Sequence, residues 1–90
     1  TGEARDYYDS MIKILDEHTS AEHRVEIMNT LKAFVRNKGD YKLTALDVSQ
    51  HENTVRYRMN KLRSWLDMDD DNISFYETIS LIAKYSQFLE

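Results

Sequence analysis

Hydrophobic residues recur along this chain at the spacing of helices, and no stretch shows the alternation typical of a half-buried strand. Five segments carry such a stripe, at about residues 4–17, 20–38, 41–48, 51–66 and 74–88, so the sequence predicts an all-α domain of five helices. The residues expected to face the core are Tyr8, Met11, Ile12 and Leu15 in the first segment, Ile27, Met28, Leu31, Phe34 and Val35 in the second, Leu43, Ala45, Leu46 and Val48 in the third, Val55, Met59, Leu62 and Leu66 in the fourth, and Ile79, Ile82, Ala83 and Phe88 (or Phe75 and Tyr76) in the fifth.

Polar residues mark where these helices should begin and end. Thr19 with Glu22, and Ser74 with Glu77, have the spacing of capping boxes, whose side chains satisfy free N–H groups in a first helical turn. Gly39 follows the second helix, where a left-handed cap is favoured. The chain has no proline and only two glycines in 90 residues, so little else interrupts its helices.

A short helix, a break at 49–51 and a longer helix follow one another between about residues 41 and 66. This is the helix-turn-helix arrangement, whose second helix, here about 52–66, enters the major groove of DNA. With the apolar stripe of that helix turned inward, the opposite side forms what we call the outward arc, which holds no acidic residue. The outward arc consists of Asn53, Thr54, Arg56, Tyr57, Asn60, Lys61 and Ser64. Asn and Arg pair with base edges, and Thr, Tyr, Ser and Lys bind phosphates.

The charge distribution supports a nucleic-acid partner, although the net charge of −4 does not. Residues 32–63 contain eight basic and three acidic residues, a local charge of +5, and the remainder contains four basic and thirteen acidic residues, a charge of −9. A basic centre between acidic flanks predicts one electropositive surface on an acidic body.

Several residues of this segment have alternative interpretations. One alternative is that Arg56, Lys61 and Arg63, in the helix at about 52–66, form only a solvated helix surface. Arg58 lies near the buried flank, where it either contacts a phosphate or forms an internal ion pair. His51 either caps the helix or approaches DNA. Glu52 either stabilises the helix, as an acid in its first turn paired with Arg56 at i, i+4, or accepts a hydrogen bond from a cytosine amino group.

Residues 45–59 resemble the C-terminal helix-turn-helix of PucR/CdaR-type bacterial regulators, which include the purine catabolism and carbohydrate diacid regulators. The segment A-L-D-V-S-Q-H-E-N-T-V-R-Y-R-M matches the family motif A-x-x-L-x-V-H-R-N-T-L-R-Y-R-L in His51, Asn53, Thr54, Arg56, Tyr57 and Arg58. Upstream, T-L-K-A-F at 30–34 is similar to the family's T-L-R-A-Y, and the resemblance extends loosely over 8–88. The family usually has Arg in place of Glu52 and an apolar residue in place of Gln50. The first difference bears on the operator sequence, and the second loosens the packing of the turn.

The resemblance implies sequence-specific DNA binding by a cytoplasmic transcription regulator, through a turn similar to that of the factor for inversion stimulation. It also implies a sensory region, with any effector site, outside this chain. Residues 1–90 are therefore expected to form a single domain from the C-terminal part of a longer regulator. The residues expected to contact double-stranded DNA are His51, Glu52, Asn53, Thr54, Arg56, Tyr57, Arg58, Asn60 and Lys61.

Other functions receive little support from the sequence. There is no cysteine, and the three histidines are not paired at i, i+4, so a zinc site is not expected. Asp67, Asp69 and Asp71 imitate the start of a calcium loop, but Glu77 then falls one position too early. No catalytic grouping, phosphate loop, cofactor motif or membrane-spanning run is present.

The alternative function, from a different class, is a helical module for protein–protein interaction or dimerisation that does not bind nucleic acid. The chain has more tyrosines near its ends than a small bundle needs, which predicts that some face a second copy in a homodimer. These are Tyr7, Tyr8, Tyr76 and Tyr85.

Overall fold

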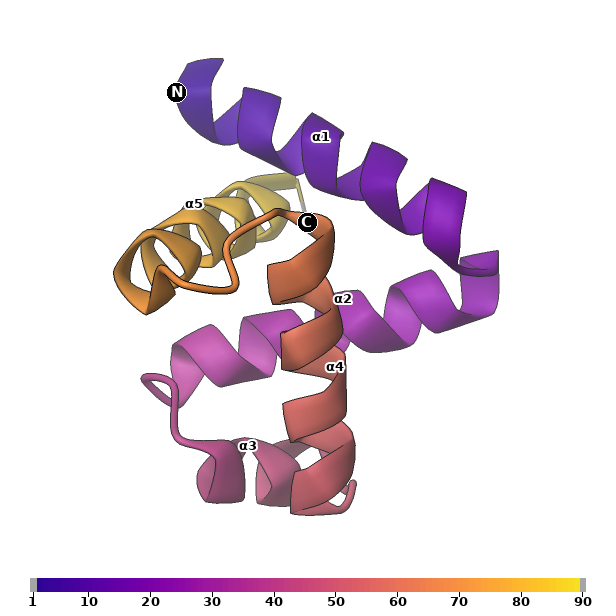
Figure 1. Ribbon diagram of the computed structural model, residues 1–90, viewed down its shortest axis with the longest axis vertical. Coiled ribbons are helices and arrows are strands. Elements are labelled where there is room, and N and C mark those ends of the chain that lie inside the picture. The colour runs from indigo at the N-terminus through magenta and orange to yellow at the C-terminus, as the bar shows by residue number, and fades with distance from the viewer. Residues whose placement is uncertain (1, 90) are drawn as a thin grey trace.

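The computed structural model describes residues 2–89 and consists of five α-helices (Figure 1). The helices are α1 (Gly2–His18), α2 (Ala21–Arg36), α3 (Tyr41–Val48), α4 (Glu52–Trp65) and α5 (Asn72–Leu89). No strand occurs within residues 2–89. The predicted all-α domain of five helices is therefore confirmed.

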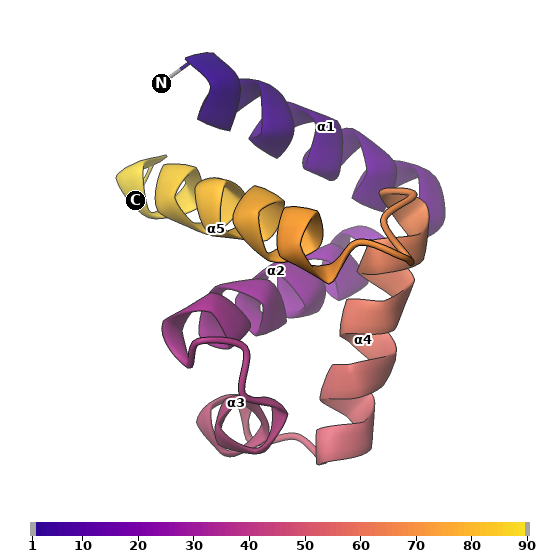
Figure 2. The ribbon, with the colours of Figure 1, turned by 60° about the vertical axis from the view of Figure 1, so that its left-hand side comes forward.

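The central helix, α2, packs against each of the other four. Helices α1 and α5 pack on each other at one end of the molecule, and α3 lies at the opposite end (Figures 1 and 2). Helix α4 runs along one side from α3 up to the level of α1. At its upper end, the ring of Trp65 stacks on that of His18 with their centroids 4.8 Å apart. Helix α4 is thus held at its first turns by α3 and near its last turn by the end of α1.

One hydrophobic cluster draws residues from all five helices. The predicted stripes of α1, α2 and α4 supply most of it. The apolar side chains without exposed surface are Met11, Leu15, Leu31, Ala33, Val55, Met59, Leu62, Ile79 and Ile82. Burial of the Val55, Met59 and Leu62 side chains fixes the rotation of α4 about its axis and turns the outward arc away from the core.

The predicted core side of α3 was partly wrong: Ala45 and Val48 pack in or against the core, but the two leucines do not. Leu43 and Leu46 are 51% and 73% exposed, whereas Thr44 is fully buried beside Ala45. An eight-residue helix buries one narrow side, and here that side includes positions 44 and 45, with Val48 half-buried one turn on. The buried hydroxyl of Thr44 donates a hydrogen bond to the carbonyl oxygen of Asp40 at 2.6 Å, which offsets the cost of burying it.

The prediction for the last helix was partly wrong. Phe88 is 83% exposed, whereas Phe75 is buried and Tyr76 half-buried. The buried side of α5 continues along the helix to Ser86. Two residues further on, the helix has turned by about 200°, so Phe88 points away from the core.

Both predicted capping boxes were wrong, and neighbouring residues cap the helices. Ser20 caps α2 by accepting a hydrogen bond from the His23 backbone N–H at 3.2 Å. The Thr19 hydroxyl instead donates to the Leu15 carbonyl oxygen at 2.7 Å. Asp71 accepts from the Ser74 backbone N–H at 3.0 Å, and α5 begins two residues before Ser74. The hydrogen bonds from the backbone N–H and the hydroxyl of Ser74 hold the pKa of Asp71 below its ordinary value.

Gly39 is left-handed as predicted, but it shares this role with Lys38, the residue that directly follows the C-cap and has a φ of 55°. The φ of Gly39 is +79°, in the left-handed region, and its N–H donates to the Phe34 carbonyl oxygen at 2.8 Å. A Cβ at this position would lie 3.5 Å from the ring of Tyr76, in ordinary contact, so the backbone conformation rather than space favours glycine. The tight reversal delivers the chain from α2 into α3.

Candidate nucleic-acid interface

A three-residue turn connects α3 to α4, as the sequence predicted. Ser49 ends α3 in the left-handed conformation with a φ of 55°. The backbone N–H of Gln50 donates to the Ala45 carbonyl oxygen at 3.0 Å, and His51 is already extended with a ψ of 145°. These backbone conformations break the helix and redirect the chain, which sets the angle at which α4 leaves α3.

His51 caps α4. Its Nδ1 accepts a hydrogen bond from the Asn53 backbone N–H at 3.1 Å, which satisfies one of the free donors of the first turn. Since Nδ1 accepts, the proton of the neutral ring lies on Nε2. The capping interpretation of His51 is confirmed, and its contact with DNA stays a prediction.

The outward arc lies on the exposed side of α4. Tyr57 is 62% exposed, and the Lys61 ammonium lies 5.4 Å from the centre of its ring. Of the remaining members, Thr54 is half-buried and the rest are exposed: Asn53, Arg56, Asn60 and Ser64. Amide, guanidinium, phenol and ammonium groups thus share one helix surface, and each of them can donate hydrogen bonds to bases or phosphates.

The C-terminal half of the outward arc is braced by Arg63. The Arg63 guanidinium donates to the Asn60 side-chain oxygen at 2.7 Å and lies 4.4 Å from the centre of the Phe75 ring on α5. Arg63 engages the side-chain oxygen of Asn60, which leaves this exposed residue with the two N–H donors of its amide. Asn60 therefore presents a hydrogen-bond donor.

Arg56 is held between two side chains at the N-terminal half of α4. Its Nη2 and Nε lie 2.9 and 3.3 Å from Oε2 of Glu52. Its guanidinium carbon lies 4.3 Å from the centre of the Tyr41 ring on α3. The side chain of Arg56 remains 50% exposed in this arrangement. The ion pair assumed in the structural interpretation of Glu52 is therefore present.

Arg58 points to the other side of the helix, toward α2. Its side chain is 17% exposed and donates to Oγ1 of Thr30 at 3.1 Å and to a carboxylate oxygen of Glu26 at 3.3 Å. Of the two alternatives for Arg58, the structure contains the internal ion pair. A contact between Arg58 and a phosphate would require this pair to open, and it stays a prediction.

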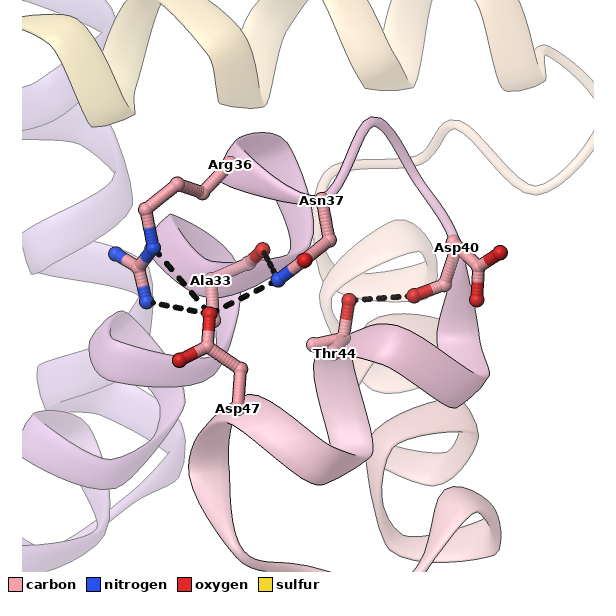
Figure 3. A network of polar contacts seen from close by, with 6 residues as sticks. All are labelled: Ala33, Arg36, Asn37, Asp40, Thr44 and Asp47. Atoms are coloured by element: carbon pink, nitrogen blue, oxygen red, sulfur yellow. Dashed lines mark hydrogen bonds and ion pairs between the residues drawn. The ribbon is translucent and has the colours of Figure 1, made fainter.

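Three polar side chains join α2 to α3 (Figure 3). Oδ2 of Asp47 accepts from Nη2 of Arg36 and from the side-chain nitrogen of Asn37, both at 2.9 Å. The Asn37 side chain also donates to the Ala33 carbonyl oxygen at 2.8 Å, so it closes α2 while it binds α3. The hydrogen bond from Asn37 and the Arg36 guanidinium hold the pKa of Asp47 below its ordinary value.

Sequence reasoning did not identify Tyr41 or the Asp47 network as part of this region. The partners in these contacts belong to different helices and are separated by 10, 11 or 15 positions, so no helical period connects them. A tyrosine at the first position of α3 carries no signal of its own. Only the angle between α3 and α4 brings it beneath Arg56.

A groove of about 380 Å³ borders the outward arc on the side of α2. Thr54, Tyr57 and Lys61 form one wall, and residues from the end of α1 and the start of α2 form the other. Arg58 and Glu26 also line it. Tyr57 and Lys61 therefore face both the solvent beyond α4 and this groove.

Other sites considered from the sequence have a structural explanation. Between α4 and α5, Asp69 accepts from the Ser64 hydroxyl at 2.8 Å, and Asp71 caps α5. Within residues 2–89, no three His, Cys, Asp or Glu side chains are grouped so as to hold a metal ion. None of the helices there is long and apolar enough to cross a membrane.

The family model of the PucR C-terminal helix-turn-helix domain matches residues 27–81. This range runs from the middle of α2 into α5 and includes all of α3, the turn and α4. Searches of curated proteins and of solved structures gave no match.

Proposed function

The chain belongs to the family of PucR C-terminal helix-turn-helix domains, and we propose that it binds double-stranded DNA sequence-specifically as part of a bacterial transcription regulator. A domain of this family indicates DNA binding by a regulator. In our proposal α4 enters the major groove and α3 lies across the phosphate backbone. We place the regulator in the bacterial cytoplasm, where its DNA lies, with any effector bound by a region outside this chain.

The observation that carries this proposal is the outward arc. Four of its members, Asn53, Arg56, Asn60 and Lys61, are exposed donors on one side of a helix whose opposite side is anchored in the core. Two acids contact the arc: Glu52 is paired with Arg56, so its charge is partly compensated, and Asp69 accepts a hydrogen bond from Ser64 at the C-terminal end of the arc. A rigid helix that presents such donors has the chemistry needed to read base edges and bind phosphates.

We assign the contacts residue by residue. Asn53 and Arg56, near the start of α4, are proposed to meet base edges, because the first turns of a recognition helix reach deepest into the groove. Thr54, Tyr57, Asn60 and Lys61 are proposed to bind phosphates or neighbouring bases. His51, Glu52 and Arg58 are proposed to lie at the interface with their primary contacts inside the protein. Domains of this kind are in general not enzymes, and we propose no catalytic role.

The salt dependence of binding to duplex DNA tests the proposal. If the domain engages about four to six phosphates, the slope of log K against log salt concentration is about −4 to −5, because each neutralised phosphate releases counterions. Lys61→Gln should make this slope less steep by about one. Lys13→Gln, an exposed cation on α1, is the matched control and should leave it unchanged. A slope near zero would instead support a module for protein–protein interaction.

A further inference from the structure

The Arg56 guanidinium rests on a row of aromatic rings that begins in the core. Phe34 is buried, and its ring lies 6.3 Å from that of Tyr76 and 5.1 Å from that of Tyr41, measured between centroids. The Tyr41 ring in turn lies 4.3 Å from the guanidinium carbon of Arg56. The position of Arg56 is therefore coupled through Tyr41 to the packed interior of the domain.

This arrangement leaves several N–H donors of the Arg56 guanidinium available to a base. Glu52 accepts from the Nε–H and from one of the two N–H groups of Nη2, and the Tyr41 ring covers a face of the guanidinium. A guanidinium has five N–H donors in one plane, so three remain for an outside acceptor. Two donors in one plane are what a guanine needs at its O6 and N7 atoms.

We propose that Tyr41 is a positioning residue that fixes the plane of the Arg56 guanidinium toward a guanine and thereby sets the preference for one G·C base pair. The inference rests on the proposed function. A free arginine loses much rotational freedom when it is ordered on a base, and a side chain already held by a ring loses less. Tyr41 thus contributes to specificity from α3 without contacting a base.

The contact with Glu52 does not replace this role. Glu52 and Arg56 are on the same helix, so their pair orients Arg56 only relative to α4. Tyr41 is on α3, which packs on both α2 and α4. The Tyr41 ring therefore restricts the orientation of the Arg56 guanidinium from outside the recognition helix. We therefore expect sequence preference to depend on the ring at position 41.

The test compares Tyr41→Phe with Tyr41→Leu. Duplexes selected from a random pool by the unaltered domain define the operator, and Arg56→Ala identifies the base pair that Arg56 reads. Competition among the four base pairs at that position then gives the preference for G·C. Tyr41→Leu should lower this preference about tenfold, because an unheld arginine discriminates less well. Tyr41→Phe keeps the ring and should keep the preference.

The matched control is Tyr76→Leu, which removes the second ring beside Phe34 and leaves the ring under Arg56, that of Tyr41, in place. If Tyr41 only supports the core, both leucine variants lower the melting temperature and neither changes the preference. That result would overturn the inference while DNA binding stands. Should Tyr41→Leu not fold, Tyr41→Met fills the space with an unbranched chain and takes its place. Absence of salt-dependent binding by the unaltered domain would overturn the proposed function, and this inference with it.

Discussion

The Asp47 carboxylate on α3 accepts hydrogen bonds from Arg36, the last residue of α2, with Nη2 at 2.9 Å, and from Asn37, which caps that helix. The first helix of the helix-turn-helix is therefore attached to α2 by a charged contact as well as by packing. Both donors favour the ionised carboxylate, which is why its pKa is lowered.

The lowered pKa of Asp47 makes the stability of the domain depend on pH. A carboxyl group whose pKa is lower in the folded state stabilises the protein above its unfolded pKa, ordinarily 3.8, and the stabilisation is lost as pH falls through the folded pKa. We therefore expect the free energy of unfolding to decrease when the pH is lowered below about 4. Asp47→Asn should be less stable at neutral pH and should show a smaller decrease in acid, as measured by urea unfolding at several pH values. Asp70→Asn, in the exposed connector, is the control, and an identical pH dependence in Asp47→Asn would contradict this role.

The two sides of α4 should respond differently to truncation. Asn53→Ala and Arg56→Ala are expected to weaken binding to the selected operator by about 1–3 kcal/mol each, because each would remove a base contact. Both residues are exposed, so the domain should still fold. Val55→Ala, between them on the buried side, should lower the free energy of unfolding by about 2 kcal/mol. Binding titrations and thermal unfolding of all three variants check this assignment. If Asn53→Ala or Arg56→Ala unfolds the domain and Val55→Ala does not, the sides of α4 are assigned wrongly.

Glu52→Gln distinguishes the two interpretations of this acid. A glutamine oxygen can still accept from Arg56, but the charge pair and the favourable interaction with the helix dipole are lost. The free energy of unfolding should decrease by less than about 1 kcal/mol, since both side chains are substantially exposed. DNA binding should become tighter for every sequence, with the preference unchanged, because one negative charge near the phosphates is gone. Loss of discrimination at a single C·G position, found with operators varied at each base, would show that Glu52 reads a cytosine.

Substitution of His51 can separate capping from DNA contact. His51→Ala removes the acceptor for the Asn53 N–H and should cost about 1 kcal/mol of stability. His51→Asn introduces a side chain that caps well and should preserve stability. If His51 also touches DNA, the asparagine variant folds normally but binds more weakly. Equal binding by the unaltered domain and His51→Asn would limit His51 to the cap.

The aromatic side chains of α1 and α5 are where we expect a second copy to bind. The rings of Tyr8 and Tyr85 lie 5.2 Å apart and those of Tyr85 and Phe88 lie 6.4 Å apart, and Phe88 is exposed. Tyr76 does not belong to this group, because its ring packs beside Phe34 and its hydroxyl donates to the Val35 carbonyl oxygen at 3.4 Å. Phe88→Ser should weaken self-association in sedimentation experiments and leave folding intact. A monomer at every concentration would place the dimer contacts outside this chain.

The sequence predicted the buried side of a helix correctly where apolar residues repeat at helical spacing over several turns. Val55, Met59 and Leu62 recur over two turns, so they fix which side of α4 is buried. Helix α3 has only eight residues, and its leucines do not define a side. A threonine hydroxyl that bonds within its own helix can be buried in their place, as Thr44 is.

Contacts between helices could not be predicted in this way. Arg58 and its acceptor Glu26 are 32 positions apart, and Tyr41 and Arg56 belong to different helices. Their encounter depends on the angles between helices, which arise from the packing of the whole core. The cap of α2 was misassigned for a smaller reason, since Thr19 and Ser20 are adjacent and either hydroxyl could have begun this helix.

The stacking of His18 on Trp65 gives the domain a spectroscopic label of its own. Trp65 is the only tryptophan in the chain, so indole fluorescence originates entirely from the place where the end of α1 meets the end of α4. Its emission will change when the imidazole leaves the indole ring. Detachment of α1 can therefore be followed by tryptophan fluorescence, separately from the loss of helix that circular dichroism records for the whole molecule.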